Sequence, residues 1–104
     1  MAKMVVIYSM PKDPTAFDRH YFDIHVPLAK KLAGLRKYEV SRGFIATPAA
    51  ASDAYMIATL HFEDLAAIHK AFESPEGRAC AQDRAVFAPA DSDFRMYLFD
   101  EREV

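Results

Sequence analysis

The order of strand-like and helix-like segments restricts the fold of this chain more than any other feature of its sequence. Apolar residues that alternate or run together, rich in β-branched and aromatic side chains, predict strands at residues 3–9, 36–46, 54–63 and 93–99. Apolar residues at three- and four-residue intervals predict helices at residues 14–33, 65–72 and 75–87. This order, βαββαβ, is the split βαβ or ferredoxin-like arrangement. We therefore predict an α+β fold in which one four-stranded antiparallel sheet carries helices on one face.

The predicted sheet has one face that no helix covers. A chain of 104 residues corresponds to a single domain, residues 1–104. Its first and third strands, predicted to be central, carry apolar side chains on both faces. The uncovered face would leave an apolar patch too large for a stable monomer. We therefore predict a homodimer in which the two sheets pack face to face about a two-fold axis.

Composition and charge argue against several classes of function. The formal net charge is −2 and no basic run is present, so we expect no nucleic-acid partner. No apolar run approaches the ~20 residues of a membrane span, and the single cysteine, Cys80, is predicted to be a buried inert thiol in a cytoplasmic protein. The sequence has no glycine-rich phosphate loop, no His-Glu-x-x-His motif and no paired cysteines. We therefore predict neither a metal site nor a cofactor, and no association with membranes.

A proline lies inside the longest predicted helix. Apolar residues there follow helical spacing at Phe17, Tyr21, Ile24, Leu28 and Leu32. Pro27 interrupts this pattern, and an interior proline removes one helical hydrogen bond at a cost of about 3 kcal/mol. His25 lies two residues earlier, at the edge of the apolar stripe. Two interpretations stay open: a kink that directs His25 into a pocket, or a bend that serves packing alone. Gly34 is predicted to end the helix.

His25 is the main candidate for acid–base chemistry. Histidine has an unperturbed pKa of about 6.5 and can accept or donate a proton near neutral pH. The alternative is a half-buried histidine bonded to a backbone carbonyl. Tyr21, one turn earlier, would add a hydroxyl on the same face or belong to the core. Tyr8, Tyr38 and His61 lie on predicted strands, and alternation alone leaves open whether they face a cavity, the core or a dimer interface.

The segment from Ala16 to Tyr38 resembles the EthD family. The most specific parts are His25-Val26-Pro27-Leu28-Ala29 and Gly34-Leu35-Arg36-Lys37-Tyr38, and Phe72 to Gly77 fits the second helical region more loosely. The resemblance implies a dimeric α+β barrel. The family is named for a protein encoded beside a cytochrome P450 system that degrades ethyl tert-butyl ether. Related members of the superfamily are cofactor-free methylmuconolactone isomerases, polyketide cyclases and quinone-forming monooxygenases. In the lactone-isomerising relatives a histidine similar to His25 lines the pocket, whereas the absence of tryptophan here argues against the monooxygenases.

Together these features predict a cofactor-independent isomerase or cyclase that acts on a small apolar carbonyl, lactone or aromatic compound. His25 is the expected acid–base group, and Tyr21 and Tyr38 are expected to orient the substrate oxygen. Tyr8, Leu28 and His61 are the candidate ligand-binding residues. The alternatives are a non-catalytic binding or accessory protein of an oxidative degradation system, and a purely structural dimer with a collapsed pocket.

Overall fold

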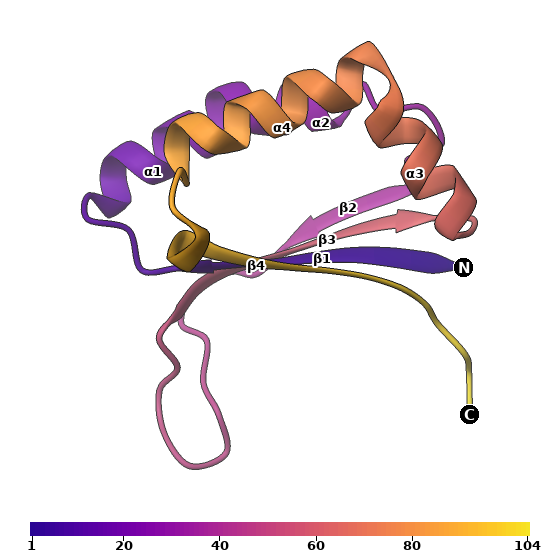
Figure 1. Ribbon diagram of the computed structural model, residues 1–104. Coiled ribbons are helices and arrows are strands. Elements are labelled where there is room, and N and C mark those ends of the chain that lie inside the picture. Colours follow the sequence, from indigo (N-terminus) through magenta and orange to yellow (C-terminus); the bar gives the residue numbers. More distant parts are fainter.

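The computed structural model describes residues 1–104 as a four-stranded antiparallel sheet with all of its main helices on one face (Figure 1). The strands are β1 (Ala2–Ser9), β2 (Lys37–Val40), β3 (Ala54–Phe62) and β4 (Phe94–Asp100). The helical segments are α1 (Pro14–His20), the π-helix η1 (Tyr21–His25), α2 (Val26–Ala29), α3 (Leu65–Glu73), α4 (Pro75–Phe87) and the 3₁₀ turn η2 (Asp91–Asp93). The α+β ferredoxin-like prediction is confirmed.

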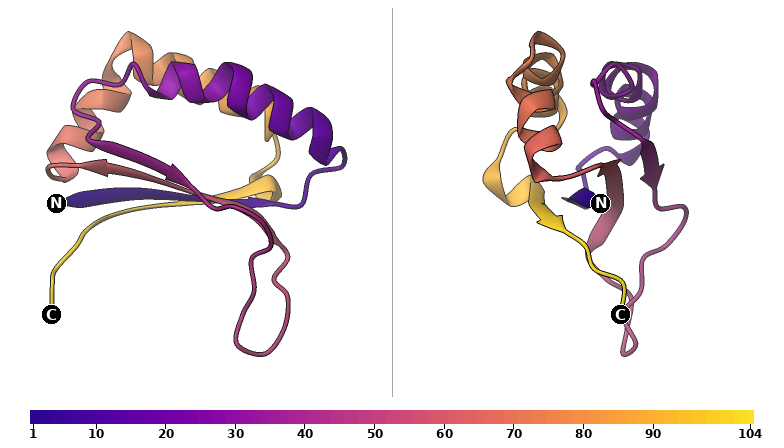
Figure 2. Two further views of the ribbon diagram at one scale, coloured as in Figure 1. Left: turned by 180° about the vertical axis from the view of Figure 1, so that it is seen from behind. Right: turned by 90° about the vertical axis from the view of Figure 1, so that its right-hand side faces the viewer.

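The strand order β2-β3-β1-β4 places the first and third strands in the centre, as the sequence predicted. In β1, Met4, Val6 and Tyr8 are buried beneath the helices, and in β3 the buried positions are Met56, Ala58, Leu60 and Phe62. The alternate residues face the other side of the sheet, and Figure 2 shows that no helix covers that side. No helix of the structure is long and apolar enough to cross a membrane.

The first helical segment is not a single kinked α-helix. A π-helix at Tyr21–His25 separates α1 from α2, and the backbone N–H of Val26 donates to the carbonyl of Tyr21, five residues earlier. This wider turn lies directly before Pro27, which has no N–H to donate. Gly34, with φ of 84°, ends the segment as predicted.

The π-helix changes which side chains are buried. A helix of uniform α pitch would bury Ile24 and Leu28, and that part of the prediction is wrong: Ile24 is 47% exposed. The wider turn advances the buried face by one position, so that His25 and Ala29 replace them, following Phe17 and Tyr21 at four-residue spacing. The distortion at the proline therefore places a histidine and a small residue where two large aliphatic side chains would otherwise lie.

The second strand is shorter than predicted. It ends at Val40 rather than Ala46, because Gly43 adopts φ of 78° in a bend and the chain leaves the sheet as an extended loop. Nothing lies within 4 Å of a Cβ built on Gly43, so this glycine supplies a turn and not a close approach. The loop projects on the side of the sheet opposite the helices (Figures 1 and 2), where Phe44 is fully exposed.

Gly77 fixes the junction between α3 and α4. A Cβ at this position would lie 2.3 Å from the carbonyl oxygen of Ala71 and from the Cα of Phe72, both backbone atoms. We expect Gly77→Ala to lower the free energy of unfolding by about 3 kcal/mol, since the two helices must separate to admit the methyl group. The matched change Gln82→Ala, on the exposed face of α4, is expected to stay within about 0.5 kcal/mol. If urea denaturation showed the same loss in the free energy of unfolding for both variants, this account of the junction would be contradicted.

Candidate functional site

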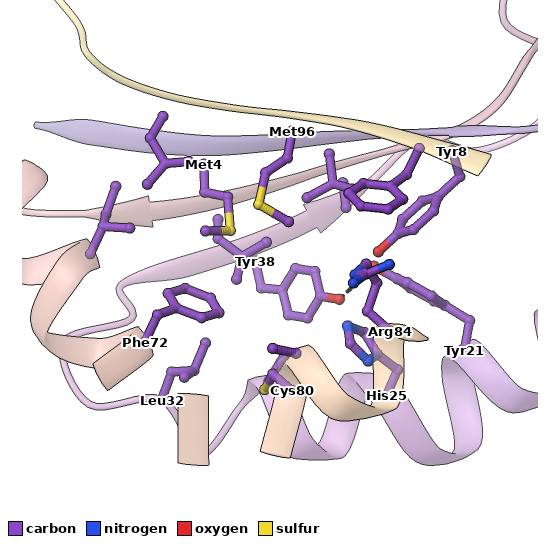
Figure 3. Close-up of a pocket in the computed structure, with 18 of the residues that line it drawn as sticks. Met4, Tyr8, Tyr21, His25, Leu32, Tyr38, Phe72, Cys80, Arg84 and Met96 are labelled. Atoms are coloured by element: carbon purple, nitrogen blue, oxygen red, sulfur yellow. Dashed lines mark hydrogen bonds between the residues drawn. The ribbon is translucent and has the colours of Figure 1, made fainter. Parts of the chain in front are cut away.

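A cavity of about 470 Å³ lies between the helices and the sheet (Figure 3). Of the 20 residues that line it, 16 are hydrophobic. They come from every strand and from both helical segments, α1–η1–α2 with the turn after it and α3–α4: Met4, Val6, Tyr8, Tyr21, His25, Ala29, Leu32, Tyr38, Ala58, Leu60, Ile68, His69, Phe72, Glu73, Cys80, Ala81, Arg84, Phe94, Met96 and Leu98. The more exposed lining residues lie on α3, α4 and the edge strand β4, so the cavity opens on that side. Its volume and composition are typical of a site for a small apolar molecule.

His25 faces this cavity from the end of the π-helix. It is 8% exposed, and its ring packs between Tyr21 and Phe87, with centroid distances of 5.3 and 4.8 Å. Its Nδ1 lies 2.9 Å from Oδ2 of Asp83. Because a carboxylate only accepts hydrogen bonds, Nδ1 carries the proton and Nε2 is left as an acceptor without a protein partner. The structure has no fully buried side-chain nitrogen or oxygen that lacks a hydrogen-bond partner. Because Nε2 has no protein partner, it is not fully buried, and since His25 lines the cavity, Nε2 faces the open space there.

The electrostatic environment favours the neutral form of His25. Burial is the main cause that lowers its pKa, and the charge of Arg84 and the nearby His20 act in the same direction. The hydrogen bond and the charge of Asp83 oppose this shift without overcoming it. At neutral pH the imidazole is therefore a free base, ready to accept a proton from a bound molecule.

Asp83 connects two histidines. Its other carboxylate oxygen, Oδ1, accepts a hydrogen bond from Nε2 of His20 at 2.8 Å. Asp83 belongs to α4, whereas His20 and His25 belong to α1 and η1, so this carboxylate joins the two helical segments that lie side by side on the sheet (Figure 2). Both oxygens have a partner, and the imidazole of His25 is held in one orientation and one tautomer.

Three tyrosine hydroxyls lie at the same end of the cavity as His25. The hydroxyls of Tyr21 and Tyr38 are 2.5 Å apart, and the ring of Tyr8 packs edge to face on that of Tyr21. Burial raises the pKa of all three side chains, that of Tyr38 to about 12. They are therefore neutral phenols, which cannot act as bases at neutral pH. One hydroxyl of the Tyr21–Tyr38 pair donates to the other, so the pair keeps one hydroxyl proton for a ligand oxygen, in addition to that of Tyr8.

The structure brings His25, Tyr21, Tyr38 and Tyr8 to one end of the cavity, and it places the other two candidates elsewhere. Leu28 is half-buried and does not line the cavity, because the π-helix turns it away and presents Ala29 instead. His61 is on the opposite face of β3, with its Nε2 2.7 Å from Glu39. Cys80 lines the cavity, and burial raises its pKa to about 11, so the thiol is protonated at neutral pH.

Two residues of the site were missed in the sequence analysis, Asp83 and Arg84. Both lie in α4, where charged side chains are commonly exposed to solvent. The spacing of Gly77, Cys80, Arg84 and Phe87 marks one face of that helix, and this spacing would have placed Arg84 among inward-facing residues. No comparable signal marks Asp83, whose role depends on helices that are far apart in the sequence. No group of three or more histidine, cysteine or acidic side chains is placed to hold a metal ion.

Comparison with known proteins identifies one protein family that matches this chain. A model described as the EthD domain matches residues 10–91. An uncharacterised 11.0 kDa protein from the thcB-thcC intergenic region of Rhodococcus erythropolis is 37% identical over 90 residues, 85% of this chain and 84% of that protein. The crystal structure of an EthD family protein from Bacillus halodurans is 31% identical, covers 98% of this chain and 99% of its own, and superposes with a TM-score of 0.87.

More distant solved structures share the fold. SnoaB, a cofactor-independent oxygenase from Streptomyces nogalater, is 16% identical with a TM-score of 0.69, covering 99% of this chain and 94% of its own. A dimeric protein of unknown function from Bacteroides fragilis, with a ferredoxin-like fold, is 17% identical with a TM-score of 0.62, covering 96% and 95% of the two chains.

Proposed function

The chain belongs to the EthD domain family, and from this premise we propose that it is an acid–base enzyme, an isomerase or cyclase of a small apolar carbonyl or lactone compound. The observation that carries this proposal is the unpartnered Nε2 of His25, which faces an apolar cavity while Asp83 holds the other ring nitrogen. A buried neutral imidazole with a fixed tautomer is suited to take a proton from a bound carbon acid.

The proposed first step removes a proton from the carbon next to the substrate carbonyl. His25 Nε2 accepts this proton, and the electron pair of the C–H bond moves into the carbonyl, which becomes an enolate. The hydroxyl of Tyr8 and the one free hydroxyl proton of the Tyr21–Tyr38 pair lie at the same end of the cavity (Figure 3), where they can donate to the developing negative charge on oxygen.

The second step decides between the two reaction types. In an isomerase, the substrate carries a carbon–carbon double bond conjugated with the enolate, and the imidazolium of His25 returns its proton to the far carbon of this dienolate, so that the carbonyl re-forms and the double bond changes position. In a cyclase, the enolate carbon attacks a second carbonyl of the same molecule, and His25 protonates the alkoxide that forms. Both routes restore neutral His25 without consuming a co-reactant. The apolar walls exclude water and hold the substrate in reach of the imidazole.

A panel of lactones, aromatic acids and polyketide-like compounds tests this proposal. We expect a subset to raise the melting temperature of the wild-type protein and some of that subset to be converted, as followed by NMR spectroscopy. Oxygen uptake in the same samples separates an isomerase or cyclase from an oxygenase. Ligands that bind tightly but are never converted would contradict the proposal that this protein is an enzyme. They would favour the alternative, a binding or accessory protein of an oxidative pathway.

We also propose that two copies of the chain pair through the open face of the sheet. This face carries Val5 and Ile7 of β1, Ile57 of β3, and Tyr97 and Phe99 of β4, the last two 51% and 41% exposed. An uncovered sheet face of this composition favours association with an identical face. The dimeric relative of the same fold supports this assembly.

Replacing Ile7 by lysine tests the dimer. We expect the wild-type protein to sediment with twice the 11.7 kDa mass of one chain, and Ile7→Lys to sediment as a monomer, because it would bury a charge at the centre of the interface. Ile24→Lys makes the same change on the exposed face of the π-helix and should remain dimeric. A dimer that survives Ile7→Lys would place the interface elsewhere.

A further inference from the structure

Arg84 is a cation at the polar end of the cavity and is held in place before any ligand binds. Its Nη1 donates to the carbonyl of Ala88 at 2.7 Å, which caps the end of α4. Its guanidinium carbon lies 4.1 Å from the centroid of the Phe94 ring. These two contacts come from the end of a helix and from the edge strand, so the guanidinium is positioned by rigid parts of the fold.

No carboxylate of the protein pairs with this guanidinium. The neighbouring Asp83 directs its two oxygens to His20 and His25, and none of the ion pairs of the structure includes Arg84. Arg84 makes one hydrogen bond to the protein, from Nη1 to Ala88. Its other guanidinium nitrogens have no protein acceptor, and none of them is fully buried, so they remain accessible to a ligand. A cation beside an apolar cavity is poorly stabilised unless an anion or strong acceptor binds to it.

The other lining residues supply no anion at the end of the cavity that holds Arg84, and they are mainly apolar at the opposite end. The nearby phenols of Tyr8 and Tyr38 are neutral, and Glu73, the one acidic residue of the lining, is exposed at the opening. Figure 3 shows Arg84 beside His25 and Tyr8, with Met4, Leu32 and Phe72 at the far end. The cavity is therefore polarised: hydrogen-bond donors and the positive charge of Arg84 lie at one end, whereas the other end is mainly hydrocarbon, with His69 and Glu73 of α3 exposed at the opening.

We propose that the ligand of this site is an organic acid whose carboxylate binds Arg84 while its apolar body fills the rest of the cavity. The planar guanidinium matches a carboxylate through two parallel hydrogen bonds, a geometry that a neutral carbonyl does not reproduce. This inference rests on the proposed function in one respect: it places the reacting carbon of that acid near Nε2 of His25. Binding of the carboxylate itself does not require turnover.

Matched carboxylate and amide probes test the proposal. Benzoate, trans-cinnamate and 2-naphthoate are each compared with their primary amides, which have nearly the same shape and no charge, by calorimetric titration of the wild-type protein. We expect at least one carboxylate to bind ten times more tightly than its amide, or better, because a charge-assisted pair is lost in the amide. Equal affinities for acid and amide, or no binding of any carboxylate at millimolar concentration, would overturn the proposal.

Variants of Arg84 then assign the preference to one side chain. Arg84→Gln should abolish the preference for the carboxylate, and Arg84→Lys should retain part of it, since lysine keeps the charge but not the planar fork. Arg78→Gln makes the same change at an exposed position of α4 and should bind as the wild type does. A preference that persists in folded Arg84→Gln would overturn the assignment. If Arg84→Gln fails to fold, the comparison of acid and amide in the wild type still decides the proposal.

The two proposals fail in different ways. If His25 has no catalytic role, the protein still binds carboxylates more tightly than amides, and only the expected dependence of turnover on His25 is missing. If Arg84 does not bind an anion, neutral lactones and ketones bind and react while the acid and amide probes are indistinguishable. The titrations use no catalytic readout, so neither result is mistaken for the other.

Discussion

Replacement of His25 by alanine is expected to lower kcat by about 10²–10⁴-fold, the range that one well-placed acid–base group supplies. Ligand binding should change much less, because the cavity is formed mainly by apolar side chains from other elements. The variant can be assayed with any compound that the wild-type protein converts. Unchanged turnover in His25→Ala would remove the proposed base from the mechanism.

Chemical rescue separates a catalytic role of His25 from a structural one. The alanine variant leaves space for a free imidazole in the position of the lost ring, beside Tyr21 and Phe87. We expect added imidazole to restore part of the turnover, increasing with the concentration of its neutral form. His25→Gln fills this space and should not be rescued. A loss of folding would show instead as a lower melting temperature that imidazole does not correct.

The pH dependence follows from the lowered pKa of His25. Only neutral His25 can accept a proton, so kcat/KM should rise with pH through an inflection below the usual value of about 6.5 and then level off. This rising limb should be absent in His25→Gln. An inflection above 6.5 in the wild type would indicate that Asp83, and not burial, controls the imidazole.

Asp83→Asn is expected to have the second largest effect, a fall in kcat of about 10–10³-fold. The asparagine amide can either accept from Nδ1 or donate to it, so it no longer fixes the tautomer that leaves Nε2 free. It also removes the shared partner of His20 and His25, which we expect to lower the free energy of unfolding by about 1–3 kcal/mol.

The pH profile of Asp83→Asn distinguishes positioning from stability alone. The hydrogen bond and charge of Asp83 raise the pKa of His25, so their removal should move the rising limb of kcat/KM to lower pH even as the plateau falls. Asp18→Asn is a matched control, since Asp18 bonds the hydroxyl of Tyr55 and lies outside the cavity. A plateau that falls without any displacement of the limb would reduce Asp83 to a structural role.

The arrangement of strands and helices was predictable because its determinants are local. The caps Asp13, Asp64 and Ser74 each accept a hydrogen bond from a backbone N–H three residues later, two of them directly before a proline. Apolar side chains on both faces of the segments that form β1 and β3 identified the central strands. The end of β2 was not predictable in this way, because an edge strand ends where its single neighbour stops pairing with it.

The candidate site was only partly predictable because its geometry depends on contacts across the fold. Pro27 marked a distortion, but the sequence did not reveal that the distortion is a π-helix, which exchanges Ile24 and Leu28 for His25 and Ala29 on the buried face. Helical spacing could have indicated that Arg84 faces inward, but Asp83 has no local signature, since its partners His20 and His25 lie in α1 and η1. Side-chain alternation likewise left the direction of His61 open, and the structure places it away from the cavity.

The most direct test of the central claim is hydrogen–deuterium exchange at the carbon next to the carbonyl of a bound ligand. The compound of the panel with the largest melting shift is incubated in deuterated buffer with wild-type protein or His25→Gln, and loss of the carbon-bound proton is followed by NMR spectroscopy. We predict exchange catalysed by the wild type and reduced by about 10²-fold or more in the variant, since exchange needs only the first proton transfer to Nε2. Equal exchange rates in the two proteins, with the ligand bound to both, would contradict the assignment of His25 as the base.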